Sequence, residues 1–187
     1  MAKKYFFLPV LILTSAYFLY SDNKNEINEI KSFYYKVNKQ IKKKQLANIK
    51  VKVEKTGVPA VGSTGKMANF YWHTVYQSVP DDTYGTDKLV KVNVLNQIAA
   101  HTWNIEYLYN SKGELIFYYI SNSSNDSGID FSGGELRLYF SQKHLIRVME
   151  GNKISDNLSG KYKKITSKVL QESELLNNFF KYMLRNE

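Results

Sequence analysis

The sequence predicts an α+β fold with an N-terminal helix, an antiparallel meander sheet of about six to seven strands, and a C-terminal helix. Through the middle of the chain, segments rich in aromatic and β-branched residues recur in pairs, separated by short runs of turn-forming residues. On either side of this region, apolar residues recur every three or four positions, as on the packed side of an α-helix. A chain of 187 residues with 43% hydrophobic residues is sufficient for one such domain.

Residues 1–21 have the pattern of a secretory signal peptide. Lys3 and Lys4 precede an apolar run over residues 5–20, and small residues lie near its end. We therefore expect a protein that is exported to the periplasm or out of the cell, with residues 22–187 as its single α+β domain.

Two cleavage sites and one alternative remain open for this leader. Cleavage is expected after Ala16 or, as a second choice with the larger Leu19 upstream, after Ser21. The apolar run is shorter than the roughly 20 residues that a spanning helix needs. An uncleaved N-terminal segment that acts as a short anchor is the alternative.

Residues 23–46 are predicted to form the first helix. Asn23 and Glu26 have the spacing of a capping box, which would start the helix there. One stripe of apolar residues follows at alternating spacings of three and four, and we expect it to pack on the sheet. The stripe consists of Ile27, Ile30, Tyr34, Val37 and Ile41.

The sheet is predicted from one alternating strand and three hairpins. Residues 48–55 alternate polar and apolar side chains, as a half-buried strand does. The hairpins then follow, each with a polar or glycine-containing turn at its centre. Their paired strands are residues 67–78 with 88–95, 102–109 with 114–121, and 135–141 with 144–150.

Alternation along these strands predicts one apolar face and a second, mixed face on which tyrosines stand among charged residues. A helix must cover the apolar face, whereas the mixed face can remain exposed. Tyrosine and arginine are enriched at binding hot spots, although cross-strand packing alone also recruits tyrosine. The possible binding face consists of Glu106, Tyr118, Arg137 and Tyr139.

Residues 160–185 are predicted to form the closing helix. Its apolar stripe includes Ile165, Val169, Leu176 and Phe179, and it is wide enough to pack against the sheet or beside the first helix. Because the segment is also basic, weak contact with an anionic membrane is an alternative. The excess of lysine lies at the two ends of the folded domain, which would suit an anionic membrane, but solvated lysine-rich helix faces explain it more simply.

No motif identifies a catalytic residue, a cofactor or a metal site. The chain has no cysteine, and its three histidines lack a metal-binding spacing. His73 together with the cluster Asp81, Asp82 and Asp87 could serve a small hydrolase or a metal-dependent enzyme, but the aspartates also suit an ordinary turn. We also expect no nucleic-acid partner, because no recognition motif is present.

The segments "IEYLYNSKGELIFYY" and "LRLYFSQKHLIRV" carry a family resemblance. They resemble hairpins of small uncharacterised exported bacterial proteins that have a leader, a lysine-rich helix and units of the type Y-x-Y-F-x-x-G-x-L-I. The resemblance covers roughly residues 26–150 and implies no catalytic residue. Together these features predict an exported non-enzymatic binding module for a protein, peptide or glycan of the cell envelope. An enzyme around His73 and an envelope-associated structural protein are the alternatives.

Overall fold

The computed structural model describes residues 8–55, 64–79, 82–98, 101–122, 131, 134–155, 158 and 160–184, and it confirms the predicted α+β class. The chain forms two helices and eight strands in the described ranges, one strand more than the upper end of the predicted number. The additional strand is β8, which is only three residues long and too short to show a period. The elements are α1 (Leu8–Lys42), β1 (Ala47–Lys55), β2 (Thr64–Val79), β3 (Asp82–Ile98), β4 (His101–Tyr109), β5 (Leu115–Asn122), β6 (Glu135–Ser141), β7 (His144–Glu150), β8 (Lys153–Ser155) and α2 (Lys161–Leu184).

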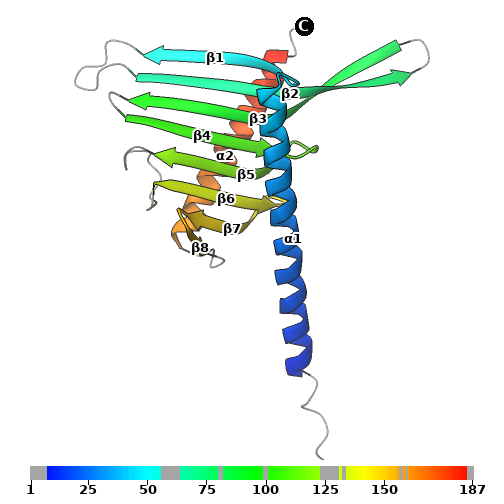
Figure 1. Cartoon of the computed structure of the whole chain (residues 1–187), viewed down its shortest axis with the longest axis vertical. Helices are drawn as coiled ribbons and strands as arrows, with labels where there is room; N and C mark the ends of the chain where they lie inside the picture. Colours follow the sequence, from blue (N-terminus) through cyan, green and yellow to red (C-terminus); the bar gives the residue numbers. More distant parts are fainter. Residues whose placement is uncertain are drawn as a thin grey trace, which may run out of the picture.

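The sheet is an antiparallel meander in which strand order follows chain order from β1 to β8. Figure 1 shows α1 crossing one face of the sheet and α2 crossing the opposite face, so the sheet is the middle layer of three. The far ends of β2 and β3 continue beyond the other strands as a two-stranded ribbon (Figure 1). Each helix buries its own cluster of apolar side chains against the sheet.

Helix α1 begins earlier than the sequence predicts. It runs without a break from Leu8, so Asn23 is an interior residue and the predicted cap at this position is wrong. The N-terminal part of α1 projects past the β8 edge of the sheet (Figure 1). Both expected cleavage sites precede Ile27, the first α1 residue that is buried among those whose side chains are described. Among the described residues, neither helix has a stretch both long and apolar enough to cross a bilayer.

The predicted α1 stripe packs on the sheet as expected. Ile27, Ile30 and Val37 are buried, and Tyr34 and Ile41 pack at the edge of the same cluster. The helix ends in a Schellman motif, in which the Gln45 backbone N–H donates to the Gln40 carbonyl oxygen at 3.0 Å. This end directs the chain into β1 after α1 has crossed the sheet.

Helix α2 covers the other face, so of the two predicted positions it takes the one against the sheet. Ile165, Val169 and Phe180 are buried there together with residues of the strands. Phe179 is part of the predicted stripe and Leu175 would widen it, yet Leu175 is exposed and Phe179 is 43% exposed. A helix presents only part of its circumference to a flat sheet, and these two side chains lie outside that part.

Three β-bulges change which side chains reach α1. Pairing shifts by one residue between β2 and β3, between β4 and β5, and between β6 and β7. The extra residues are Val90, Ile116 and Ile146, and all three belong to the apolar cluster beneath α1. Because a bulge places two successive side chains on one face, the alternation of each strand is reversed beyond it.

Candidate functional site: a tyrosine-lined cleft between α1 and the sheet

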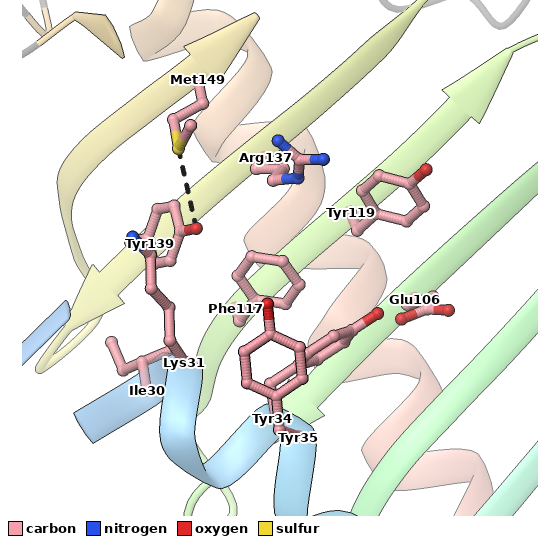
Figure 2. Close-up of a pocket in the computed structure, with 10 residues that line it drawn as sticks. All are labelled: Ile30, Lys31, Tyr34, Tyr35, Glu106, Phe117, Tyr119, Arg137, Tyr139 and Met149. Carbon is pink, nitrogen blue, oxygen red and sulfur yellow. Dashed lines mark hydrogen bonds between the residues drawn. The ribbon is translucent and has the colours of Figure 1, made fainter. Parts of the chain in front are cut away.

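A cleft of about 560 Å³ lies between one side of α1 and the strands β4 to β7 (Figure 2). Helix α1 contributes one wall, and the strands contribute the floor. Because α1 is narrower than the face it crosses, the strands remain uncovered at its side. We call this space the α1-face cleft, and it is lined by Ile30, Lys31, Tyr34, Tyr35, Glu106, Phe117, Tyr119, Arg137, Tyr139 and Met149.

A row of four aromatic rings runs from the α1 wall across the floor. Ring centroids are 5.7 Å apart for Tyr35 and Tyr34, 5.1 Å for Tyr34 and Phe117, and 5.1 Å for Phe117 and Tyr139. Tyr35 is at the outer end of the row and is 70% exposed. At the inner end, the Tyr139 hydroxyl donates to the Met149 sulfur at 3.7 Å, and a thioether is a weak acceptor (Figure 2).

An ion pair lies behind the cleft, where a lysine is buried between α1 and the sheet. The side chain of Lys91 is 2% exposed, and its Nζ lies 2.8 Å from Glu106 Oε2. The same Nζ donates to Asn38 Oδ1 at 2.6 Å and lies 4.7 Å from the centroid of the Tyr34 ring. Helix α1 is thereby fastened to β3 and β4 by a charged contact.

Burial shifts the pKa values of two groups beside Glu106, Lys91 and Tyr34. Desolvation lowers the pKa of Lys91, and the negative charge of Glu106 opposes this shift. Desolvation, reinforced by the charge of Glu106, raises the pKa of the Tyr34 hydroxyl to about 12. Tyr34 is therefore neutral at physiological pH and can donate a hydrogen bond.

A second charge pair stands at the other end of the floor. Arg137 Nη2 lies 2.6 Å from Glu135 Oε1, and the Tyr119 hydroxyl donates to Glu135 Oε2 at 3.3 Å. The guanidinium carbon of Arg137 is 5.8 Å from the centroid of the Tyr119 ring. Both members of this pair are partly exposed, so they can reach a ligand while they remain paired.

The structure brings together three of the four residues predicted for the binding face. Glu106, Arg137 and Tyr139 share the α1 face and line the cleft. The sequence predicts that this face can remain exposed, but α1 crosses it. Only the part beside α1 is uncovered, and this part forms the cleft.

The placement of Tyr118 on this face is wrong. Tyr118 is 0% exposed and lies on the α2 face, where its ring centroid is 5.2 Å from that of Tyr107. The bulge at Ile116 reverses the alternation of β5. Both sides of this strand are apolar, so no contrast between polar and apolar residues indicates which face each side chain takes. Tyr119, flanked by Glu106 and Arg137 on the neighbouring strands, stands at the cleft instead.

Sequence reasoning missed most of the aromatic row. The helical period predicts Tyr34 only as part of the packing stripe, and simple alternation along residues 114–121 places Phe117 and Tyr119 on the side opposite Tyr118, with the apolar set. Tyr35 has no pattern that separates it from an ordinary exposed helix residue. The one usable signal is the charge on both neighbouring strands beside Tyr119.

Among the described residues, His73 does not lie beside an aspartate of the predicted cluster. His73 pairs with Lys88, whereas the next residue along each strand forms the pair Thr74 and Asp87, so His73 and Asp87 point to opposite faces. Asp87 accepts a hydrogen bond from Thr74 Oγ1 at 2.6 Å. Asp81 lies outside the described residues, and the Asp82 side chain is not described. No group of three or more acidic, histidine or cysteine residues in the described ranges could hold a metal ion.

Comparison of the chain with protein-family models, with curated proteins and with solved structures found no match. The resemblance of residues 26–150 to exported bacterial proteins therefore stays a prediction. Function has to be inferred from the geometry and chemistry of the cleft.

Proposed function

We propose that the protein is an exported, non-enzymatic binding module that holds its ligand in the α1-face cleft. The observation that supports this proposal is a concave site of about 560 Å³ in which a row of aromatic rings lies beside two charge pairs that flank Tyr119. Small-ligand sites are concave, mainly apolar and furnished with a few convergent polar groups. The α1-face cleft is concave and carries such convergent polar groups, and its exposed lining is slightly more polar than apolar.

The shape of the site favours a short segment of a ligand over a broad protein surface. A stable protein–protein interface buries roughly 800 Å² on each partner and is close to flat, whereas this site is a recess beside a helix. A glycan or peptide segment of the cell envelope matches a recess of this size. Tyrosine and arginine supply contact area and hydrogen bonds at low cost in conformational entropy.

Native mass spectrometry of the purified protein, incubated with the peptide and saccharide fraction of an envelope digest, tests this proposal. We expect the parent protein to retain a ligand that Tyr35→Ala and Arg137→Gln lose. Tyr76→Ala is the matched control, because Tyr76 is also 70% exposed but lies on the β2–β3 ribbon. Equal ligand retention by the parent and both cleft variants would refute the proposed site.

Export is the second part of the proposal, and it rests on the leader sequence. We expect N-terminal sequencing of protein recovered outside the cytoplasm to begin after Ala16 or Ser21. Recovery of soluble cytoplasmic protein that starts at Met1 would contradict export and leave the binding site to be judged on its own test.

A further inference from the structure

We infer that the ligand of the α1-face cleft is a neutral or acidic saccharide, which makes the proposed function more specific and rests on it. The inference follows from three properties of the cleft: the hydrogen bonding of its floor, the exposed aromatic ring of Tyr35 on its wall, and the pairing of its charges. Each property distinguishes a saccharide from a peptide.

The floor offers no backbone groups to a peptide. Strands β4, β5 and β6 each pair with a neighbour on both sides, and Phe117 at the centre of the floor lies between Leu108 and Tyr139. An extended peptide is normally recognised by adding a strand to a free edge, which the floor lacks. Its amide groups would then have to find partners among a few side chains or remain unpaired at a cost.

The exposed end of the aromatic row suits a ligand with flat, weakly polar faces. The faces of aromatic rings carry partial negative charge, whereas the axial C–H groups of a sugar ring carry partial positive charge. Tyr35 on the α1 wall is 70% exposed, and the Tyr34 ring beside it is tilted by 70° (Figure 2). A sugar unit can stack on Tyr35, while the buried Phe117 supports the row from beneath.

The polar groups of the cleft match hydroxyl groups, which both donate and accept hydrogen bonds. Glu106 offers an acceptor and Arg137 offers donors, and both side chains are partly exposed. Glu106 and Arg137 already have counter-ions within the protein, so the ligand does not have to supply one. Lys31 adds an exposed positive charge at the rim, which permits an acidic sugar and disfavours a basic one.

Isothermal titration calorimetry and saturation-transfer NMR with a defined panel test the inference. The panel contains neutral β-glucan and chitin oligosaccharides, acidic galacturonate oligosaccharides, and a pool of random pentapeptides. We expect the full chain to bind at least one oligosaccharide, and Tyr35→Ala to weaken this binding by about tenfold or more, since loss of one aromatic hot spot has this size. Tyr76→Ala should bind as the parent does.

Charge variants on α1 sharpen the test. Lys31→Glu should weaken binding of acidic oligosaccharides more than binding of neutral ones. Lys39→Glu, the same charge reversal at an exposed position of the same helix that does not line the cleft, should leave both unchanged.

The outcomes separate the saccharide inference from the proposed function. If only peptides bind and Tyr35→Ala abolishes that binding, the saccharide inference is overturned and the cleft remains the binding site. If no oligosaccharide binds, the saccharide inference is also overturned. If a ligand of either class binds equally well to the parent and to Tyr35→Ala, the cleft is not the site and the proposed function is overturned with the inference.

Discussion

Helices α2 and α1 cover opposite faces of one sheet with contacts of different kinds. Beneath α2 the contacts are apolar and aromatic, with Phe180 close to the rings of Phe70 and Trp72. Two tyrosine hydroxyls on that face are bonded directly to the helix: Tyr107 donates to Glu172 at 2.9 Å, and Tyr109 donates to the Ser173 carbonyl oxygen at 3.1 Å. Beneath α1 a lysine is buried, and clefts of about 560 and 630 Å³ remain beside the helix.

We interpret this difference between the two faces as a division between stabilising the fold and binding a ligand. Burial of apolar surface stabilises the fold, and a close-packed face leaves no room for a ligand. A buried ion pair contributes little net stability, because desolvation offsets the attraction, but it can fix how two elements sit against each other. We interpret the α2 face as the source of stability and the α1 face as a helix held in place over a recess.

The largest predicted effect lies on the α2 face. Phe180→Ala should lower the free energy of unfolding by about 3–5 kcal/mol, because it removes a buried ring and leaves a cavity. The neighbouring Phe179→Ala should cost much less, since Phe179 is 43% exposed. Urea unfolding measures both, and equal losses would show that α2 is not packed through Phe180.

A smaller effect is expected from the ion pair under α1. Lys91→Met should cost about 2 kcal/mol or more, because it leaves the Glu106 carboxylate without its counter-ion. The double variant Lys91→Met with Glu106→Gln should recover part of this loss. A double-mutant cycle in urea gives the coupling, and additive losses would mean that Lys91 and Glu106 do not stabilise each other.

Alkaline pH should weaken the α1 face in a way that depends on Tyr34. The folded-state pKa of Tyr34 is about 12, above the ordinary value of 10.0, so the unfolded chain loses this proton first and stability falls between these pH values. Between about pH 8 and about pH 11, the free energy of unfolding should therefore fall by about 1 kcal/mol less for Tyr34→Phe than for the parent protein. Identical pH dependence of the two proteins would contradict this assignment.

The smallest effect, with the opposite sign, is expected at Tyr118. In the described structure its buried hydroxyl has no hydrogen-bond partner. Tyr118→Phe removes that polar group and keeps the ring, so it should raise the free energy of unfolding by roughly 0.5–1 kcal/mol. Thermal unfolding and ligand binding should be followed together, and a loss of binding would return Tyr118 to the functional site.

The helices and strands could be predicted because each depends on a local period. The 3-4-3-4 spacing of Ile27, Ile30, Tyr34, Val37 and Ile41 and the hairpins around "NSKG" and "QK" required only neighbouring residues. The short β8 has no such period. The predicted helix start at Asn23 was wrong because α1 continues on both sides of this residue.

The site was only partly predictable, because it depends on strand register and on distant partners. Glu106, Arg137 and Tyr139 could be grouped by alternation, but the bulge at Ile116 placed Tyr118 on the other face. The burial of Lys91 has no signature in its own strand, because the groups that surround it come from α1 and β4. These contacts exist only after the sheet and α1 have assembled.

The most direct test compares two tyrosines of nearly equal exposure on the two helices. Tyr35 on α1 is 70% exposed, and Tyr182 on α2 is 67% exposed. Calorimetric titration of Tyr35→Ala and Tyr182→Ala with the saccharide that binds the parent should show unchanged binding for Tyr182→Ala and a loss of about tenfold or more for Tyr35→Ala, with similar unfolding midpoints. Equal binding by the two variants, or a loss confined to Tyr182→Ala, would contradict the assignment of binding to the α1 face.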